Sequence, residues 1–161
     1  AAVYSAAFSP DGALVLTASA DCTAKIWGVE SGECVRTLQG HGRLVRSAVF
    51  SPDGALVLTA SVDCTAKIWE VESVECSRTL QGHGRGVTSA TVSPDGALAL
   101  TASEDRTAKI WDVESGECLR SLQGHERPVL SAVFSPHGAL VLTASADSAA
   151  KIWDAESGEC L

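Results

Sequence analysis

The feature that most constrains this chain is an internal repeat of 42 residues. Tryptophans recur at that interval, as Trp27, Trp69, Trp111 and Trp153. The repeat divides the chain into residues 1–42, 43–84, 85–126 and 127–161, of which the last is cut short. The first two units differ at only 8 of 42 aligned positions, so one local structure must serve them both. A chain of this kind is expected to fold as a series of like modules, each stabilised by its neighbours.

Each unit is predicted to form a small antiparallel sheet of short strands. In the second unit the expected strands are Val45–Phe50, Ala55–Ser61, Thr65–Trp69 and Cys76–Gln81. Ser51-Pro52-Asp53-Gly54 predicts a turn, because proline fixes φ and glycine tolerates positive φ. The second strand is apolar at nearly every position, which indicates burial on both faces between neighbouring sheets. No unit shows a convincing helical period of apolar residues, so we expect an all-β fold.

Composition disfavours several classes of function. The chain carries 12 basic against 20 acidic residues, a formal net charge of −8. An acidic surface repels phosphate backbones, which disfavours nucleic-acid binding. No apolar run approaches the roughly 18 residues of a membrane span, and no signal peptide is recognisable. We therefore expect no membrane association and a cytoplasmic location.

The six cysteines argue against disulfides and metal sites, because they are repeat positions. One position is shared by Cys34, Cys76, Cys118 and Cys160, and another by Cys22 and Cys64. None forms a Cys-x-x-Cys pair, and the histidines do not have the spacing of zinc ligands. We expect reduced thiols in an intracellular protein, with no metal and no other cofactor.

The repeat resembles the WD40 repeat over the whole chain. Gly40-His41, Ser51-Pro52-Asp53-Gly54 and the interval Asp63…Trp69 follow the family pattern in order and spacing. The Gly-His and Trp-Asp pairs recur as Gly82-His83 with Trp111-Asp112, and as Gly124-His125 with Trp153-Asp154. The resemblance implies a β-propeller with one four-stranded blade per unit, a fold that usually serves as a platform for protein complexes.

A few positions depart from the family pattern. Gly28 and Glu70 stand where the family usually has the aspartate after tryptophan, a position that the family often relaxes. His137 replaces the turn aspartate of the fourth unit. Val74 replaces a turn glycine that the other units keep as Gly32, Gly116 and Gly158. If this position has a positive φ, a β-branched residue there is strained by roughly 1–2 kcal/mol.

The second, third and fourth units each contain a histidine, a threonine, an aspartate and a tryptophan at the same offsets. These tetrads are His41, Thr59, Asp63 and Trp69; His83, Thr101, Asp105 and Trp111; and His125, Thr143, Asp147 and Trp153. An acid, a base and a hydroxyl suggest nucleophilic catalysis, but an enzyme needs one organised site, whereas this set recurs in every unit. The resemblance implies a structural role, in which the aspartate holds the histidine, and histidine and threonine face the indole N–H. We therefore expect no catalytic residue and no enzyme activity.

The units disagree at a few offsets, and these are the candidate partner-binding positions. They are Ala2, Leu44, Gly86 and Pro128; Tyr4, Arg46, Thr88 and Leu130; and Ala20, Val62, Glu104 and Ala146. The resemblance places them on the top face of a propeller, where a rigid scaffold carries binding residues on loops and strand ends. Tyrosine and arginine are common interface anchors, which favours a surface diversified for protein or peptide recognition. The alternative is sequence drift at solvent-exposed positions that tolerate any residue. One offset in the fourth strand also varies between the units although it should lie away from the top face, and this supports the alternative.

Three loop arginines share an offset beside the variable positions: Arg43, Arg85 and Arg127. They would form a partial basic arc, suited to a carboxylate-rich or phosphorylated peptide. Solvated loop arginines are the simpler interpretation.

Four units do not match the roughly seven or eight blades with which this family usually closes a ring. The last unit also stops two residues into its fourth strand, at Cys160-Leu161. Two alternatives stay open: a fragment of a longer propeller protein, which we favour, or half of an eight-bladed ring completed by a second copy. The leading functional hypothesis is an interaction scaffold or recognition module. A structural unit that builds rings from identical halves and a propeller enzyme are the alternatives.

Overall fold

The computed structural model describes all 161 residues, and its regular elements are all β-strands. The first sheet contains β1 (Val3–Phe8), β2 (Leu14–Ser19), β3 (Thr23–Gly28) and β4 (Cys34–Gln39). The second contains β5 (Val45–Phe50), β6 (Leu56–Ser61), β7 (Thr65–Glu70) and β8 (Cys76–Gln81). The third contains β9 (Val87–Val92), β10 (Leu98–Ser103), β11 (Thr107–Asp112) and β12 (Cys118–Gln123). The fourth contains β13 (Val129–Phe134), β14 (Leu140–Ser145) and β15 (Ala150–Asp154). The predicted all-β fold is confirmed.

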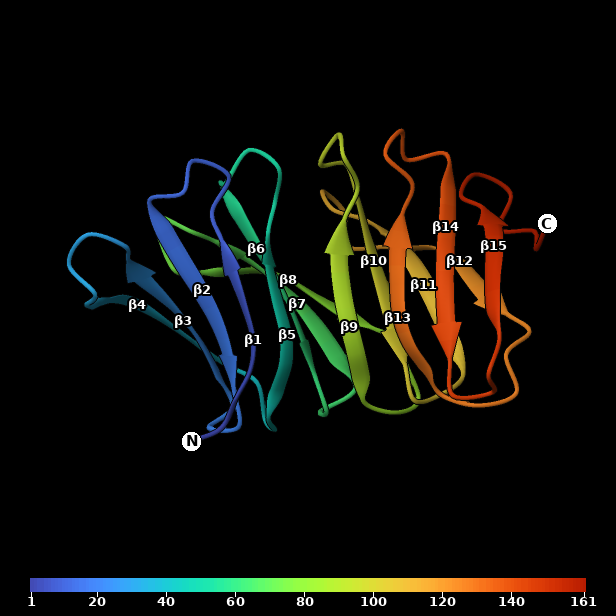
Figure 1. Cartoon of the computed structure of the whole chain (residues 1–161), viewed down its shortest axis with the longest axis horizontal. Coiled ribbons are helices and arrows are strands. Elements are labelled where there is room, and N and C mark those ends of the chain that lie inside the picture. The colour runs from blue at the N-terminus through green and yellow to red at the C-terminus, as the bar shows by residue number, and fades with distance from the viewer.

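Each sheet is an antiparallel meander in which sequential strands pair, and we call the sheets blades 1 to 4. The first strands of successive blades contact one another in the order β1, β5, β9, β13, so they form the inner side of the assembly. Blades 1 and 4 lie at opposite ends of the molecule, with the two termini (Figure 1). The chain is therefore an open series of propeller blades, with one tryptophan in the third strand of each blade.

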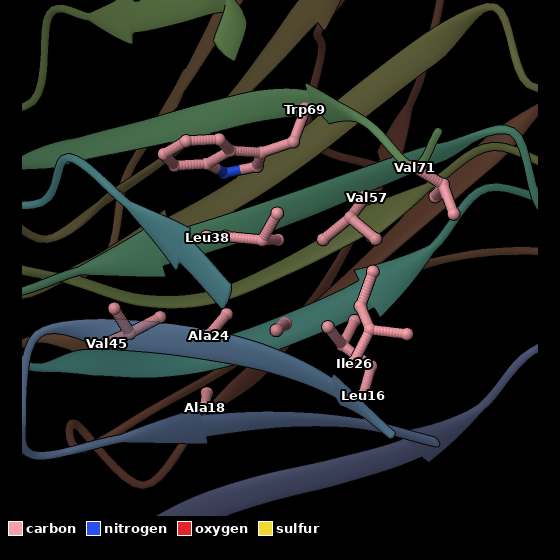
Figure 2. Packing of buried hydrophobic residues seen from close by; sticks show 10 residues of the cluster. Leu16, Ala18, Ala24, Ile26, Leu38, Val45, Val57, Trp69 and Val71 are labelled. Atoms are coloured by element: carbon pink, nitrogen blue, oxygen red, sulfur yellow. The ribbon is translucent and has the colours of Figure 1, made fainter. Parts of the chain in front are cut away.

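Each blade packs one face on the next blade, and the apolar core lies in these junctions. Between blades 1 and 2, Leu16 and Ile26 of blade 1 meet Val57 and Trp69 of blade 2 (Figure 2). We call the Leu16 side of a blade its front face and the Trp69 side its back face. The same arrangement recurs between blades 2 and 3 and between blades 3 and 4.

The second strands of the two central blades are buried on both faces, as the sequence predicted. In β6, Val57 contributes to the junction with blade 1 and Leu58 to the junction with blade 3. In β14 of the terminal blade, by contrast, buried and exposed residues alternate. The difference arises because blade 4 has a neighbour on its back face only.

The turns have the expected backbone conformations. Gly54 has a φ of 75°, which is consistent with the predicted Pro-Asp-Gly turn. Val74 has a φ of 63°, in the left-handed region that its counterpart Gly116 also occupies. The position therefore does have the conformation that favours glycine. All six cysteines are unpaired. The structure contains no helix with the length and apolar character needed to cross a bilayer.

Candidate functional site

One of the two offsets at which all four units differ lies in a β-bulge. The pairing of β1 with β2 shifts register between Val3 and Ser5, which leaves Tyr4 as the extra residue. The pairings of β5 with β6, β9 with β10 and β13 with β14 shift at the same place, and there the extra residues are Arg46, Thr88 and Leu130. Bulges redirect side chains and are common beside functional sites. The framework thus presents one divergent side chain per blade at the same point of the inner strand.

The other two variable offsets lie beside the bulges and are paired through the backbone. The N–H of Ala20 donates to the carbonyl of Ala2 at 2.8 Å, and Val62 donates to Leu44 at 3.1 Å. The corresponding bonds in blades 3 and 4 join Glu104 to Gly86 and Ala146 to Pro128. The structure therefore brings all three offsets to one edge of every blade, the edge at which the N-terminus lies in Figure 1. We call this surface the variable edge.

Within the variable edge, blades 2 and 3 are joined by an ion pair. Arg46 Nη2 lies 2.8 Å from Glu104 Oε1, and both side chains are about one-third exposed. Gly86 lies beneath this contact, because a Cβ at that position would be 3.4 Å from Glu104 Oε2 and 3.3 Å from the Cα of Val62. Gly86 is buried and has no side chain to contact a partner. Its role is to leave space for the side chain of Glu104.

The four bulge residues differ in exposure and in the contacts that they make. Tyr4 and Leu130 are more than half exposed. Thr88 is half-buried, and its hydroxyl donates to the carbonyl of Val129 at 2.7 Å, across the junction between blades 3 and 4. The surface that remains for a partner is therefore aromatic at blade 1, charged at blades 2 and 3, and aliphatic at blade 4.

A cleft of about 520 Å³ opens between blades 3 and 4 at the variable edge. It is lined by Gly84, Arg85, Glu104, Asp105, Arg106, Glu126, Arg127 and Pro128. The structure thus brings Arg85 and Arg127 into one cleft with Arg106, a residue with a φ of 74° whose counterparts are uncharged. Because acidic side chains line the same cleft, its charge is mixed, and the basic arc expected from the sequence is not a separate patch.

The opposite edge also carries clefts, but these repeat from blade to blade. Two clefts, of about 380 Å³ each, lie at the junctions of blades 2 and 3 and of blades 3 and 4. Most of their lining residues correspond, as Ile68 does to Ile110 and Arg78 to Arg120. Arg78 Nε donates to the carbonyl of Glu114 at 2.7 Å, and Arg120 Nε donates to that of Glu156 at 2.6 Å. These arginines, which join neighbouring blades, were missed in the sequence; their recurrence at the repeat interval was the available signal.

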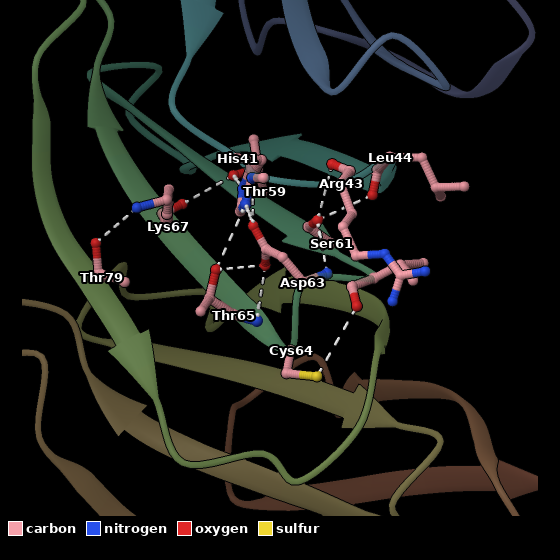
Figure 3. A network of polar contacts seen from close by, with 12 residues as sticks. His41, Arg43, Leu44, Thr59, Ser61, Asp63, Cys64, Thr65, Lys67 and Thr79 are labelled. Carbon is pink, nitrogen blue, oxygen red and sulfur yellow. Dashed lines mark hydrogen bonds and ion pairs between the residues drawn. The ribbon is translucent and has the colours of Figure 1, made fainter.

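The three tetrads form hydrogen-bonded chains with nearly identical geometry. In blade 2, Trp69 Nε1 donates to Thr59 Oγ1 at 2.9 Å. Thr59 Oγ1 lies 2.7 Å from His41 Nε2, and His41 Nδ1 lies 2.8 Å from Asp63 Oδ2 (Figure 3). The same contacts, at 2.8 Å, join His83 and His125 to their partners. The network implies the tautomer in which Nδ1 donates to the carboxylate and Nε2 accepts from the threonine.

The titration behaviour of the tetrads follows from this geometry. Burial lowers the pKa of His41 and of His83, and the facing aspartates only partly offset that effect. Burial alone would raise the pKa of Asp63, but hydrogen bonds from Thr65, His41 and the Gly42 N–H outweigh it and lower the pKa to about 2. A neutral imidazole beside an ionised carboxylate is the arrangement that these shifts favour near neutral pH.

One feature of the tetrads was not foreseen. A further threonine takes part: Thr65 Oγ1 donates to Asp63 Oδ1 at 2.6 Å, and Thr107 does the same to Asp105 at 2.7 Å. In blade 4 this threonine is replaced by Ala149, which supplies only its N–H to Asp147. Blade 1 has no histidine in this role, and Trp27 donates to Thr17 alone at 2.9 Å.

A family model described as "WD domain, G-beta repeat" matches residues 1–28, 32–70, 74–112 and 116–154. Together these segments cover most of the chain. The chain belongs to the WD40 repeat family. The sheets are accordingly WD40 blades, and the molecule is a partial WD40 propeller. Members of this family generally act as interaction modules for other proteins rather than as catalysts.

Similar WD40-repeat proteins match short segments of the chain. The nuclear distribution protein nudF of Aspergillus flavus is 52% identical over 40 residues, 25% of this chain and 9% of that protein. The probable E3 ubiquitin ligase complex SCF subunit sconB of Talaromyces stipitatus is 59% identical over 27 residues, 17% of this chain and 4% of that protein. An uncharacterized WD repeat-containing protein of Nostoc is 43% identical over 44 residues, 27% of this chain and 4% of that protein. The matches thus span less than a tenth of each relative.

Proposed function

We propose that this chain is a recognition module that binds a protein or peptide across its variable edge. The observation that carries the proposal is the coincidence of sequence divergence with the bulges. Most strand positions are the same in every blade, apart from the fourth-strand offset of Val35, Ser77 and Leu119. The single extra residue of each inner strand, by contrast, is tyrosine, arginine, threonine or leucine. A rigid scaffold with divergent residues at corresponding strand ends is the usual design of a binding surface.

The chemistry of the edge favours an extended partner with both apolar and charged groups. Tyr4 and Leu130 are exposed at the two ends of the variable edge, and the ion pair of Arg46 with Glu104 lies between them. Tyrosine and arginine supply much of the binding energy in protein interfaces. The cleft beside Arg106 offers donors and acceptors together, which suits a peptide backbone or a polar side chain better than a lone anion.

Names of the relatives support the same class of function. The SCF subunit sconB is by its name part of a protein complex, and it shares the repeat with this chain.

A peptide selection tests the proposal. The 161-residue chain would be used to select binders from a displayed library of random peptides. Selected peptides are expected to lose at least about 10-fold in affinity for the variant Tyr4→Ala/Arg46→Ala/Thr88→Ala/Leu130→Ala, a loss of about 1.4 kcal/mol. The control variant Val35→Ala/Leu119→Ala changes exposed residues of β4 and β12, on the outer strands, and should bind as the parent does. Equal binding to both variants, or no enrichment of any peptide, would count against recognition at this edge.

A further inference from the structure

The edge opposite the variable edge carries another offset at which the blades differ. The pairing of β7 with β8 shifts register between Ile68 and Trp69, which leaves Ser77 as the extra residue. The pairings of β3 with β4 and of β11 with β12 shift at the same place, and there the extra residues are Val35 and Leu119. The variable offset of the fourth strand therefore lies in a bulge, as the variable offset of the inner strand does, and a bulge redirects a side chain out of the regular pleat.

Two of these outer bulge residues line the clefts between blades. Ser77 lines the cleft between blades 2 and 3, and Leu119 takes the corresponding place between blades 3 and 4. Blades 2 and 3 are both complete four-stranded sheets, and the cleft between them is as large as its counterpart, about 380 Å³. The clefts are therefore a property of the internal junctions and do not depend on the outer faces of the terminal blades.

The lining of these clefts is largely apolar. Between blades 3 and 4 it includes Leu98, Ile110 and Leu119, of which Leu119 is 41% exposed. Between blades 2 and 3 the equivalent leucine and isoleucine are kept, but the bulge residue is a serine. The bulge residue thus decides how much apolar surface a cleft offers, while the rest of the lining changes little.

Unpaired carboxylates surround the clefts. The turn from the third to the fourth strand contains two glutamates and no lysine or arginine; in blades 2 to 4 the glutamates are Glu72 and Glu75, Glu114 and Glu117, and Glu156 and Glu159. Glu114 lines one cleft and Glu156 the other, and neither takes part in an ion pair. The arginines of the clefts, Arg78 and Arg120, donate to backbone carbonyls instead. We call the two clefts and these turns the acidic edge; it lies opposite the N-terminus in Figure 1.

We propose that the acidic edge binds an extended protein segment in which lysine or arginine alternates with aliphatic side chains. The aliphatic side chains enter the clefts of successive junctions, and the basic side chains pair with Glu114 and Glu156, which have no other cation. Charge complementarity of this kind attracts basic partners and repels acidic ones. The proposal does not rest on recognition at the variable edge, since the two surfaces lie at opposite edges of the blades.

Fluorescence anisotropy of a labelled peptide in which lysine and leucine alternate tests the proposal on the 161-residue chain. The peptide is expected to bind, and added salt should weaken the binding because the contacts are charged. Peptides that alternate glutamate with leucine, or lysine with serine, should bind at least about 10-fold more weakly. Failure of the lysine-leucine peptide to bind would overturn the proposal. Equal binding of the glutamate peptide would overturn the basic partner, and equal binding of the serine peptide would overturn the role of the clefts.

Exchanges at the outer bulge locate the site. Ser77→Leu gives blade 2 the residue of blade 3 and should raise the affinity for the lysine-leucine peptide by about 10-fold. Leu119→Ser is the reverse change and should lower it by a similar factor. Each variant uses a residue that another blade has in the same bulge, so the fold should be kept, as circular dichroism can verify. Unchanged affinity in both variants would overturn binding in the clefts.

A charge exchange tests the rim of the clefts. Glu114→Gln/Glu156→Gln keeps the carbonyls that bind Arg78 and Arg120, and should lower the affinity for the lysine-leucine peptide by about 5-fold or more. The control Glu30→Gln/Glu33→Gln removes the same charge from the turn of blade 1, outside both clefts, and should bind as the parent does. Equal losses in the two variants would mean attraction to net charge alone and would overturn the site.

The two proposed surfaces can be told apart with variants already introduced. The variant with alanine at the four inner bulge positions should bind the lysine-leucine peptide as the parent does, whereas Val35→Ala/Leu119→Ala should bind it more weakly. Peptides held at the variable edge should show the opposite pattern. If only the inner bulge variant lost the lysine-leucine peptide, that peptide would be bound at the variable edge and the proposal for the acidic edge would be wrong.

Discussion

At the scale of the residue, each complete tetrad depends on the hydroxyl of one buried threonine. Thr101 is 0% exposed; its oxygen accepts from Trp111 Nε1 at 2.8 Å and lies 2.8 Å from His83 Nε2. The hydroxyl is the single group that satisfies both rings, so its loss leaves two buried polar atoms without partners.

Replacing Thr101 by valine keeps the volume of the side chain and removes these bonds. Each unsatisfied buried group costs about 1–3 kcal/mol, so we expect Thr101→Val to lower the free energy of unfolding by about 2–6 kcal/mol. Thr17→Val is the matched control, because Thr17 accepts from the indole of Trp27 and donates weakly to the Lys25 carbonyl, but has no histidine partner. Urea unfolding measures both variants. Equal losses in the two would contradict a role for the histidine bond.

The pKa shifts of the tetrads make stability depend on pH. In the unfolded chain histidine titrates near 6.5 and aspartate near 3.9. In the folded chain the pKa values of His41 and His83 are lower, and those of Asp63 and Asp105 are about 2. Below pH of about 6.5 the unfolded chain therefore binds more protons than the folded chain, and below about 4 the aspartates add to that difference.

We accordingly expect the free energy of unfolding to fall as pH decreases from about 6.5, and to fall more steeply below about 4. Urea midpoints measured at a series of pH values would show both steps. The variant His41→Gln/His83→Gln should be less stable but should lose the upper step. A midpoint that stays constant between about pH 6.5 and 5 in the parent would contradict neutral, buried histidines.

At the scale of the element, the turn between the third and fourth strands connects local strain with the packing of blades. In blades 3 and 4 this turn contains Gly116 and Gly158, and an arginine of the preceding blade donates to a carbonyl of the turn. In blade 2 the turn contains Val74, and Arg36 makes no such bond to it. Val74 gains some contact with the apolar junction in exchange.

Val74→Gly should relieve the strain of a β-branched residue at a φ of 63°. The strain of roughly 1–2 kcal/mol exceeds what the lost packing and the freer unfolded chain cost, so we expect a gain of about 1 kcal/mol. For a chain of this size that raises Tm by about 2–4 °C, measurable by calorimetry.

The reverse change supplies the control. Gly116→Val introduces the same strain at a φ of 77°, where a Cβ would lie 3.3 Å from the Cδ of Arg78. Its Tm should fall. If Val74→Gly left Tm unchanged or lowered it, the packing of Val74 would outweigh the strain of its backbone.

At the scale of the whole molecule, the position of a blade in the series decides how much the same residue contributes to stability. Leu100 and Leu142 occupy the same place in their repeats, in β10 and β14. Leu100 is buried between blades 3 and 4, whereas Leu142 lies on the free front face of blade 4. Stability of such a series is approximately a sum of blade terms and junction terms, and the terminal blade lacks one junction.

We therefore expect unequal costs for the same substitution. Leu100→Ala removes buried methyl groups and should lower the free energy of unfolding by about 2–5 kcal/mol. Leu142→Ala should cost roughly 0.5 kcal/mol or less in dilute solution, as is usual for an exposed position. Denaturant unfolding at low protein concentration compares them. Similar losses would mean that the free face of blade 4 is already covered.

The sequence by itself determined the strands, the turns and the family of this protein. The strands expected in the second unit agree with β5 to β8 to within one residue at each end. They were predictable because strand propensity, turn residues and the repeat interval are local properties, repeated often enough to remove ambiguity. Comparison of the repeats also identified the offsets that meet at the variable edge. It could not show that Thr88 bonds across a junction or that Arg46 reaches Glu104, since both contacts join different blades.

Only the tertiary structure decided which copies of a repeated residue are buried. Val3 and Val45 occupy the same position in their repeats, yet one is exposed and the other is not. Burial depends on whether another blade lies against the face, and no local pattern encodes that. The hydrophobic contribution of a residue in this fold is therefore a property of the junction that it enters, because apolar area is removed from water only where two blades meet.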